Sequence, residues 1–472
     1  MLVLGSEPNS NAFGENMATE QTTLDMDRLG ELLERGERPQ LRMLLNEQHA
    51  ADLAEMFREL DLPQRVRCFR LLDLDNASAV LAEMPAEGQR LLLRELGDIG
   101  VAPIISKMSP DDAADLLSDM PKDKAASIIN QMGDAEAIGD LYELMSFKDD
   151  TAGGIMSTDY VSVHATSTVE QALTDLRESY EEFDEHVYDI FVVDAQEKLV
   201  GYLSVKVLLT APADATVESL MDTSVIAVST DTDQEEAAEK LSKYDLLSLP
   251  VVDKMGALRG VITADDAIDV LEEEATEDIY QASGIDAGSA ENAEELASSV
   301  RMAFRARLPW LLATLLIECG SAAVITKFDA VIQQTVVAAS FMPMLTSVTG
   351  SVAMQSTCIV LRNTRQYNWR AAARNIWHEI RVGMLLGLAC GLLTSCISLI
   401  FQQHGHLGVV VGVSLFVTMS LGVLIGTLIP IIFDRLGIEP AHASGPLITS
   451  LLDVCTMTIY LSIVYTFLEH LK

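Results

Sequence analysis

Basic residues and paired cysteines are the features that this 472-residue sequence has least of. Lys and Arg total 32 against 70 Asp and Glu, and so acidic a surface repels phosphate, so no nucleic-acid partner is expected. The six cysteines form no CxxC pair, which excludes a zinc site or a disulfide framework of the usual spacing. No GxxxxGKS or GxxxxGKT segment is present, so nothing predicts ATP hydrolysis, and the chain is not expected to be an enzyme.

Charge and apolar residues are concentrated in different parts of the chain. Residues 301–472 carry 11 basic and 7 acidic residues, a net of +4, which leaves a net of −42 on residues 1–300. Yet 49% of all residues are apolar, and the mean hydropathy is +0.23. We therefore expect an acidic front end joined to an apolar back end, which is not the pattern of an ordinary soluble protein.

Five long apolar runs follow residue 307. Each has about the 17–25 residues that a membrane-spanning helix needs. Arginines precede the first run and fill the connection after the second, whereas the connection after the third has no Lys or Arg. The positive-inside rule then predicts a cytoplasmic N-terminus, and five spans place the C-terminus outside a plasma or inner cell membrane. The predicted spans are 308–325, 336–361, 382–401, 407–433 and 446–468.

Polar side chains inside these runs are informative because each is costly in lipid. Asp453 lies near the middle of the last run, with Thr449 one turn earlier. The second run carries Ser347, Ser351 and Gln355 at helical spacing. Carboxylate, hydroxyl and amide oxygens suit a hard cation such as Mg²⁺, so these helices are predicted to line an ion path. For the hydroxyls alone, hydrogen-bonded packing between helices is the alternative.

Three further expectations concern the same runs. Pro343 and Gly350 are expected to interrupt the second span, and Thr456 and Tyr460 extend the polar face of the last one. Glu318 is a second acid, in the first run. It either lines the path or is protonated and bonded to a neighbour, and the sequence does not choose between these roles.

The front end contains two kinds of internal repeat. The segment VVD at 192–194 returns at 251–253, and Gly201 returns as Gly260 at the same offset of 59 residues. Each unit reads as a strand, a helix, two strands joined at these glycines, and a helix. Earlier, ASAVLAEMP at 77–85 returns as AADLLSDMP at 113–121, 36 residues later. Residues 25–148 are therefore predicted to be stacked helix pairs forming a small superhelix.

The densest group of acids lies between residues 265 and 278, just before the first span. A charge run is usually a solvated face, but little Lys or Arg accompanies this one, so like charges repel strongly unless a cation neutralises them. Such a group is expected to couple cytoplasmic divalent cations to the membrane part. Asp111 and Asp112 open a predicted helix, where an interaction with the helix dipole is the simpler interpretation.

On these motifs the chain resembles the MgtE family of magnesium channels over about residues 25–472. The resemblance implies a homodimer in a lipid bilayer, with Mg²⁺ between the cytoplasmic domains holding the pore shut until Mg²⁺ falls. Residues 149–277 resemble a tandem CBS pair, and because such pairs commonly bind adenine nucleotides, ATP is an open candidate ligand. The matching pieces are DDAADLL (111–117), DDTAGGIMSTDYVSV (149–163), DTDQEEAAEKLSKYDLLSLPVVD (231–253), DDAIDVLEEEATEDI (265–279) and ASGPLITSLLDV (443–454).

The resemblance also implies domains and cation-binding residues. The implied domains are a disordered 1–24, a helical N domain at 25–148, CBS domains at 149–277, a connecting plug helix at 278–304 and a five-helix pore domain at 305–472. Asp453 matches the pore carboxylate, and Thr449 matches a position that offers its backbone to the pore site. The implied sensing acids are Asp111 and Asp115 in the N domain, with Asp266, Asp269, Glu274, Glu277 and Asp278 around the second CBS unit and the plug.

Departures from the family pattern keep other functions open. Ser351 stands where the family has Asn, Gln355 is kept, Glu439 stands where Asp is common, and Glu318 has no counterpart. A multidomain Mg²⁺ channel gated by intracellular Mg²⁺ is the expected function. A transporter of Mn²⁺ or Co²⁺, and a non-conducting membrane sensor built on the CBS pair, are the alternatives.

Overall fold

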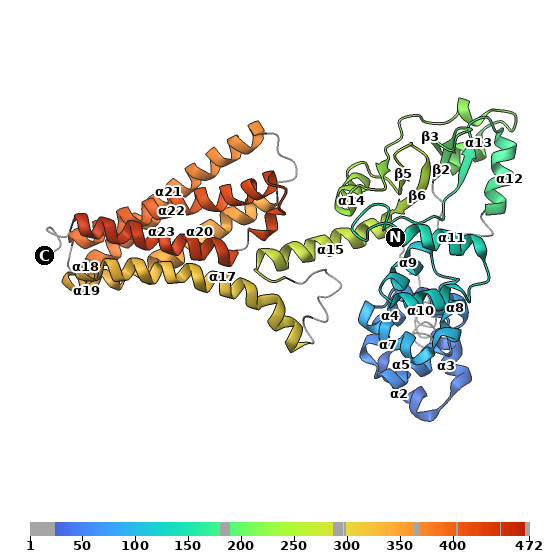
Figure 1. Ribbon diagram of the computed structural model, residues 1–472, viewed down its shortest axis with the longest axis horizontal. Coiled ribbons are helices and arrows are strands. Elements are labelled where there is room, and N and C mark those ends of the chain that lie inside the picture. The colour runs from blue at the N-terminus through green and yellow to red at the C-terminus, as the bar shows by residue number, and fades with distance from the viewer. Residues whose placement is uncertain are drawn as a thin grey trace, which may run out of the picture. The chain divides into compact units, whose positions relative to one another are not determined.

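The computed structural model describes residues 24–179, 189–286, 296, 299–362, 369–402, 405–443 and 445–467 (Figure 1). The chain divides into two compact units, Met1–Glu272 and Glu273–Lys472. Residues 1–23 of the segment expected to be disordered lie outside the described residues. Leu24, the last residue of that segment, is buried in the core of the first unit.

The first unit begins with short amphipathic helices stacked in two rows. Those that begin at residues 50, 62, 74, 86, 98, 110 and 122 start one every 12 residues. α4 contacts α6, α6 contacts α8 and α8 contacts α10, while α3 contacts α5 and α5 contacts α7. The bounds are α2 Met26–Arg35, α3 Arg38–Leu45, α4 Ala50–Glu59, α5 Leu62–Phe69, α6 Leu74–Ala82, α7 Ala86–Leu96, α8 Asp98–Ile105, α9 Pro110–Ser118, α10 Lys122–Ile129 and α11 Ala135–Leu144.

Local chemistry explains where these helices start. The carboxyl oxygens of Asp25, Asp61 and Asp73 accept the backbone N–H three residues later, at 2.8, 2.8 and 3.0 Å, which satisfies an otherwise unpaired donor of the first turn. The superhelix predicted from the sequence is confirmed. The 36-residue repeat seen in the sequence spans three of these 12-residue helices, so it relates α6 to α9 without defining a helix pair.

Two βα units follow, each with a three-stranded sheet. In each sheet the first strand runs parallel to the second and the second antiparallel to the third. The first βα unit contains β1 Ser162–His164, α12 Val169–Ser179, β2 Asp189–Val193, β3 Leu199–Ser204 and α13 Val205–Thr210. The second contains β4 Val228–Ser229, α14 Gln234–Lys243, β5 Ser248–Val252, β6 Leu258–Thr263 and α15 Ala264–Ala282, and a short 3-10 turn η1 Val217–Ser219 precedes it. The repeated order of elements predicted from the sequence is confirmed.

Gly201 and Gly260 lie inside β3 and β6, so the expectation that they form the turns was wrong. They are needed because other chain segments cross over them. A Cβ atom on Gly260 would lie 2.6 Å from the Ser157 carbonyl oxygen, and one on Gly201 would lie 2.7 Å from the Met221 sulfur. In the second βα unit the turn lies between β5 and β6, where Gly256 has a φ of +84°.

The segment that enters the first βα unit pairs with the second one instead. Ala152 donates its N–H to the Thr232 carbonyl at 2.7 Å, and Ser157 exchanges backbone bonds with Val261 at 2.8 and 2.9 Å. Met156 is fully buried beneath this crossing. One apolar core therefore runs from the helical stack into the second βα unit, which brings α9 and α15 together.

The second unit contains five helices among the described residues that are long and apolar enough to cross a membrane. The third is longer than predicted, because α21 begins at Trp369 instead of residue 382. The predicted second span, 336–361, is broken between residues 339 and 342, and Pro343 lies in the first turn of the helix that follows the break, as expected. Gly350 lies within α20 and does not interrupt it. The bounds are α17 Val300–Lys327, α18 Asp329–Gln334, α19 Val336–Ala339, α20 Met342–Leu361, α21 Trp369–Gln402, α22 Gly405–Arg435, the 3-10 turn η4 Pro440–His442 and α23 Gly445–Thr466.

Small residues allow the membrane helices to approach closely. A Cβ on Gly391 of α21 would meet the Gly412 carbonyl of α22 at 2.6 Å, and one on Gly422 of α22 would meet the Thr349 carbonyl of α20 at 3.1 Å. Interfaces of this kind are typical of helices packed in lipid. They hold α20 between α22 and α23, both of which it contacts.

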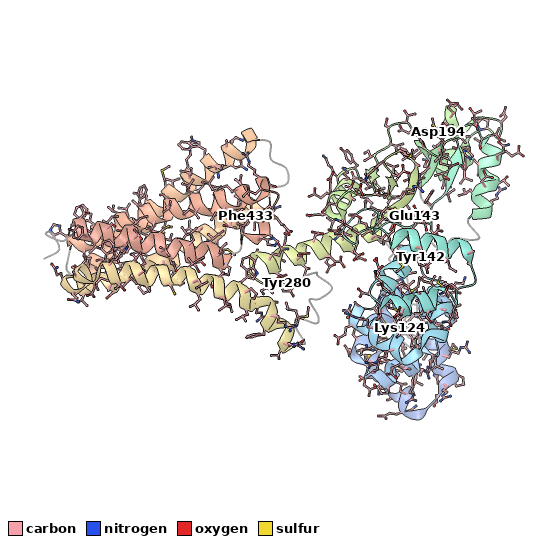
Figure 2. All side chains as sticks on the ribbon, in the orientation of Figure 1. Lys124, Tyr142, Glu143, Asp194, Tyr280 and Phe433 are labelled. Atoms are coloured by element: carbon pink, nitrogen blue, oxygen red, sulfur yellow. The ribbon has the colours of Figure 1, made fainter. Side chains whose placement is uncertain are left out.

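The segment before α17 is described in part. Residues 278–282 continue α15, the predicted plug residues 287–295 and 297–298 lie outside the described residues, and α17 begins at Val300. Near the end of α15, Tyr280 packs in a small cluster with Leu296 and Ala306. Figure 2 labels Tyr280 on this helix and Phe433 near the end of α22.

Candidate metal centres

A cavity of about 920 Å³, lined in part by polar side chains, lies between α20 and α23. All four residues predicted to form the pore site line it, namely Asp453, Thr449, Ser351 and Gln355. The remaining lining residues, all on α20, are Thr346, Ser347, Gly350, Met354, Cys358 and Ile359. The two helices meet closely here because a Cβ on Gly350 would lie 3.2 Å from the Thr449 methyl group.

The cavity hydroxyls are oriented by their own helices. Ser351 donates to the Ser347 carbonyl at 2.8 Å, and Thr449 donates to the Gly445 carbonyl at 2.9 Å. A hydroxyl that donates its proton to the backbone keeps its oxygen lone pairs for other partners. With the Asp453 carboxyl and the Gln355 amide, the cavity wall offers oxygen donors of the kind that hard cations bind.

Other polar residues of these helices do not line the cavity. Tyr460 is buried and donates to the Ala338 carbonyl at 2.7 Å, and Thr456 is also buried, so the expected polar face of α23 does not continue along the cavity beyond Asp453. Thr349 donates to Thr418 of α22 at 3.0 Å, and Ser356 donates to Glu379 of α21 at 3.2 Å. For Thr349 and Ser356 the alternative of interhelical bonding is the correct one.

Glu318 lies beside Asp453. Its carboxyl on α17 is within hydrogen-bonding reach of the Asp453 carboxyl on α23. Glu318 is not among the residues that line the cavity. The sequence left open whether Glu318 lines the path or bonds to a neighbour, and packing of the first helix against the last brings it to Asp453.

A second group of acids lies where the helical stack meets the second βα unit. Asp111 of α9 is 7% exposed, and its Oδ1 atom has no hydrogen-bond partner among the described residues. Burial raises its pKa above the usual range, and the nearby carboxyls of Asp266 and Asp112 add to the shift. An Asp carboxyl held this way favours either a proton or a cation.

Asp266, the acid that faces Asp111, is held in place by Thr263 at the end of β6. Asp266, in the first turn of α15, accepts hydrogen bonds from the Thr263 hydroxyl and backbone N–H. Burial raises the pKa of Asp266 despite these bonds, to about 6. Asp112, by contrast, accepts from the Ser109 hydroxyl at 2.7 Å at the start of α9. Both Asp111 and Asp112 lie in the first turn of α9, as the dipole interpretation expects, but Asp111 is the one that is buried near Asp266.

Further acids surround this pair. Glu83, at the end of α6, interacts electrostatically with Asp269, Asp112 and Asp265. Sequence reasoning missed Glu83, because it stands alone at a helix end and only the stacking of α6 near α9 and α15 brings it to the group. Asp269 and Asp115 are exposed on α15 and α9, and Glu274 is half-buried further along α15.

A third group of acids lies in the second unit. Burial raises the pKa of Asp278 to about 6, with further contributions from Glu439 and Glu277. Glu277 accepts from the Gln281 amide at 2.7 Å, and Glu439 lies 3.6 Å from His442. The end of α15 and the loop before α23 thus present carboxyls to each other.

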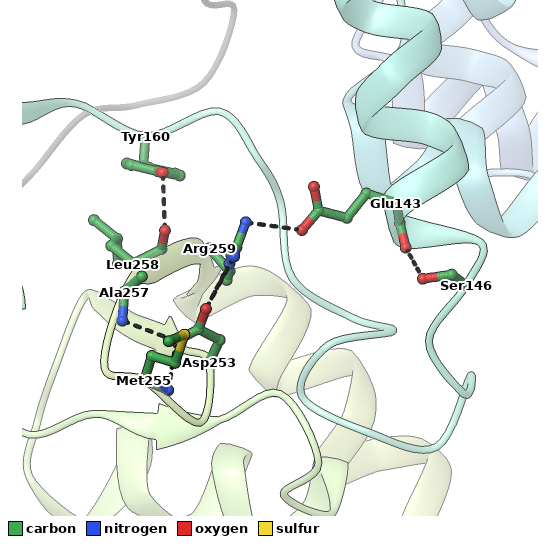
Figure 3. Close-up of polar contacts among 8 residues, drawn as sticks. All are labelled: Glu143, Ser146, Tyr160, Asp253, Met255, Ala257, Leu258 and Arg259. Carbon is green, nitrogen blue, oxygen red and sulfur yellow. Dashed lines mark hydrogen bonds and ion pairs between the residues drawn. The ribbon is translucent and has the colours of Figure 1, made fainter. Parts of the chain in front are cut away.

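The helical stack is also tied to the second βα unit by an ion-pair network. Arg259 of β6 contacts Asp253 at 2.9 Å and Glu143 of α11 at 3.4 Å (Figure 3). Asp253 in turn accepts the N–H groups of Met255 and Ala257 at 2.8 and 3.0 Å. The network is partly exposed, so each ion pair stabilises the fold by about 1 kcal/mol or less.

No three His, Cys, Asp or Glu side chains converge to form a closed metal site within the described ranges. Mg²⁺ loses its water reluctantly and usually binds through one or two carboxylates plus several waters. Pairs such as Asp111 with Asp266, and Asp278 with Glu439, fit that mode of binding better than they fit a dehydrated ion.

Comparison with known proteins identifies each region. A family model described as a divalent cation transporter matches residues 342–463, the MgtE intracellular N domain matches 48–150, and the CBS domain matches 152–214 and 217–273. The magnesium transporter MgtE of Bacillus subtilis is 37% identical over 332 residues, which cover 70% of this chain and 72% of that protein. The Thermus thermophilus magnesium transporter MgtE is 37% identical over 328 residues, covering 69% and 72%.

A solved structure is similar to the front end. The cytosolic domain of the Mg²⁺ channel MgtE in complex with ATP aligns with a TM-score of 0.50 and 34% identity. It covers 52% of this chain and 100% of that chain. The helical stack and the paired βα units therefore have a counterpart in a known cytosolic domain, and the tandem CBS fold expected from the sequence is confirmed.

Proposed function

This chain belongs to the MgtE family, and on that premise we propose that it carries Mg²⁺ into the cell through its five-helix membrane region, residues 305–472. The cavity at Asp453 is the observation that carries the proposal. It places a carboxyl, an amide and several hydroxyls between two helices that are otherwise apolar. An intramembrane acid facing such a cavity marks an ion pathway.

The cavity supports a homodimer. The cavity is not enclosed by this chain alone, and polar groups at membrane depth must face water or protein instead of lipid. A second copy of the chain facing the first would close the cavity into a path between two Asp453 carboxyls. A hydrated Mg²⁺ ion fits between two carboxylates, because it keeps most of its water.

The membrane potential supplies the driving force. Moving two positive charges inward across 100 mV gains about 4.6 kcal/mol, twice the gain for one charge. With the cytoplasmic N-terminus predicted from the arginine loops, the acidic domains lie on the side where the ion arrives. An uptake path without ATP hydrolysis then needs a gate that closes when cytoplasmic Mg²⁺ is plentiful.

We propose that the acids of residues 25–148, of the CBS pair at 149–277 and of the plug at 278–304 form this gate. The buried and unpartnered Oδ1 of Asp111, next to Asp266, supports the proposal, since Mg²⁺ would neutralise the pair. Asp115 and Asp269 extend the first cluster, Glu274 lies further along α15, and Glu277 and Asp278 with Glu439 form the second cluster. When Mg²⁺ leaves, repulsion separates the carboxyls and opens the path.

The CBS pair is proposed to bind ATP as a further ligand. The similar cytosolic domain was solved in complex with ATP, and the match covers 100% of that domain. Nucleotide binding would stabilise the pair in proportion to its occupancy. A titration of the full chain with ATP, with and without Mg²⁺, tests this part separately.

The test of transport is growth of a magnesium-transport-deficient host that expresses the chain. Rescue at low external Mg²⁺ is expected, and its loss in Asp453→Ala, with normal membrane insertion, would assign it to the cavity. No rescue by the unaltered chain would overturn Mg²⁺ uptake and favour a non-conducting sensor.

One observation favours a second candidate cargo. The matching family model is described by divalent cations in general, and Ser351 offers a hydroxyl where the family has an amide. Transport of Mn²⁺ or Co²⁺ is therefore the alternative. Competition by these ions in an uptake assay with radioactive or fluorescent readout separates the two.

A further inference from the structure

Glu318 and Asp453 form a pair of carboxyls inside the membrane region. They come from α17 and α23 and lie within hydrogen-bonding reach of each other. The two helices pack closely, since a Cβ on Gly320 would lie 3.2 Å from the Val454 side chain. Two acids in contact at this depth need a positive partner to be stable.

Two buried hydroxyls, each one turn from one of the acids along its helix, have no hydrogen-bond partner among the described residues. Ser321 lies one turn after Glu318 on the same face of α17, and Thr456 lies one turn after Asp453 on the same face of α23. Ser321 is 8% exposed and Thr456 is 1% exposed. Neither hydroxyl oxygen has a partner among the described residues.

Neighbouring hydroxyls on the same helices behave differently. Thr326 of α17 donates to the Ala322 carbonyl at 2.8 Å, and Thr458 of α23 donates to the Val454 carbonyl at 2.7 Å. The hydroxyls of Ser321 and Thr456 therefore differ from these neighbours, which donate to the backbone carbonyl four residues earlier on the same helix. Leaving a buried hydroxyl unpaired is unfavourable, so an additional ligand at this place is favoured.

The chemistry of the four side chains indicates which ligand fits. A proton shared between Glu318 and Asp453 would satisfy the carboxyls but leave both hydroxyls unpaired. A hydrated divalent cation satisfies all four, because its charge balances two carboxylates and its waters donate to hydroxyl oxygens. A monovalent cation would leave one negative charge uncompensated in the membrane.

We propose that Glu318 is a second carboxylate ligand of the transported cation, acting with Asp453 and supported by the hydroxyls of Ser321 and Thr456. This inference rests on the proposed function, because it assigns a selectivity role within the same pathway. Glu318 makes up for the amide oxygen that Ser351 lacks. With two carboxylates from one chain at the site, divalent ions are selected over K⁺ and Na⁺.

The experiment uses the full chain in liposomes, with Mg²⁺ and K⁺ fluxes measured by fluorescent indicators. Glu318→Gln keeps the size and hydrogen bonding of the side chain and removes its charge. We expect the Mg²⁺ concentration for half-maximal flux to rise about tenfold or more, and the ratio of Mg²⁺ to K⁺ flux to fall. Glu318→Asp keeps the carboxylate and should restore most of the selectivity. Equal selectivity in Glu318→Gln and the unaltered chain would overturn the proposal.

The matched control is Asp329→Asn, which also removes one carboxyl from the membrane unit. Asp329 lies on α18 and accepts from the Gln333 amide at 2.6 Å, away from Asp453. Its fluxes should equal those of the unaltered chain. If Glu318→Gln fails to insert, Ser321→Ala is the second variant, and an unchanged half-maximal Mg²⁺ concentration in it would contradict the site.

A binding measurement separates this inference from the proposed function. Dicyclohexylcarbodiimide modifies carboxyl groups within membranes, and peptide mass spectrometry locates the modified residue. Mg²⁺ but not K⁺ should protect both Glu318 and Asp453, and protection of Asp453 should weaken in Glu318→Gln. Protection in a chain that shows no flux would refute transport and keep the ligand role. Flux without protection of Glu318 would refute the ligand role and keep transport.

Discussion

The carboxyl of Asp111 on α9 and the carboxyl of Asp266 on α15 repel each other across the contact between the helical stack and the second βα unit. The pairing depends on how the chain enters the first βα unit. Because residues 152–157 pair with the second βα unit, the helical stack is docked against α15. The docking that buries the apolar core thus forces two acids together, and a cation would relieve the conflict.

The first prediction concerns the double variant Asp111→Asn, Asp266→Asn. In the unaltered chain, Mg²⁺ at a hundredfold excess over its Kd should stabilise the docked state by about 2.7 kcal/mol. Neutralising both carboxyls removes the repulsion and the site together, so the variant should be more resistant to proteolysis without Mg²⁺ and gain little from adding it. Thermal unfolding and limited proteolysis of the full chain, each with and without Mg²⁺, measure the two effects.

The control for this experiment is Asp123→Asn. Asp123 lies in the first turn of α10, outside the acid group, so its Mg²⁺ response should match that of the unaltered chain. An unchanged Mg²⁺ response in the double variant would mean that the cation binds elsewhere.

The second prediction concerns closure of the path. Replacing Asp266, Asp269 and Glu274 by their amides removes three carboxyls from α15, and Mg²⁺ should then no longer hold the channel shut. Flux into liposomes should stay high when Mg²⁺ on the cytoplasmic side is raised to millimolar levels. Retained closure in the triple variant would show that sensing depends on other residues.

The third prediction is a dependence on pH at the end of α15. The pKa of Asp278 is raised from 3.8 to about 6, so the folded chain holds this proton more tightly than the unfolded chain does. Its stabilising contribution is fully present below about pH 4 and is lost as the pH rises through about 6. Without divalent cations, hydrogen exchange of residues 274–282 should therefore speed up between pH 5 and pH 7.5 beyond its intrinsic rate.

Two comparisons test the origin of that change. Asp278→Asn should remove most of this additional hydrogen exchange, since the amide does not titrate. Mg²⁺ should suppress it in the unaltered chain at pH 7.5, because the cation takes the place of the proton. The same additional hydrogen exchange in Asp278→Asn would mean that Glu277 or Glu439 causes the pH dependence instead.

The fourth prediction concerns the cavity. Asp453→Ala should reduce Mg²⁺ flux to background, because it removes the carboxyl from the wall, while Asp434→Asn at the end of α22 should leave flux unchanged. Surface expression and thermal stability of both variants serve as controls for insertion. Flux through Asp453→Ala at the level of the unaltered chain would contradict the assignment of the cavity as the path.

Much of the architecture follows from sequence periodicity. Apolar runs long enough to span a membrane are unmistakable, and the five spans are confirmed as helices. The grouping of Thr449 and Asp453 with Ser351 and Gln355 also follows from spacing, because each pair lies one turn apart on its helix. The length of α21 was underestimated, since its first turns carry Arg and His and do not read as apolar.

Contacts between distant segments could not be predicted in the same way. Glu83 has no local signal, and it joins the acid group only because α6 stacks near α9. Nothing in the first apolar run shows that Glu318 lies against Asp453, since the partner is on the last helix. Gly260 was expected at a turn because glycine favours turns, whereas its role is to let the segment at Ser157 cross β6.

The fifth prediction tests that crossing. In Gly260→Ala, the new Cβ would lie 2.6 Å from the Ser157 carbonyl oxygen and 2.8 Å from the Met156 side chain. The entry segment must shift, which should destabilise the front end by about 1–3 kcal/mol. Gly139→Ala on α11 has nothing within 4 Å of the new atom and should be neutral or stabilise by up to about 1 kcal/mol, because Ala is the better helix former. Because the same segment docks the helical stack, Gly260→Ala should also weaken the Mg²⁺-dependent protection from proteolysis. Equal unfolding temperatures for the two variants would show that β6 tolerates a side chain and that the crossing does not set the docking.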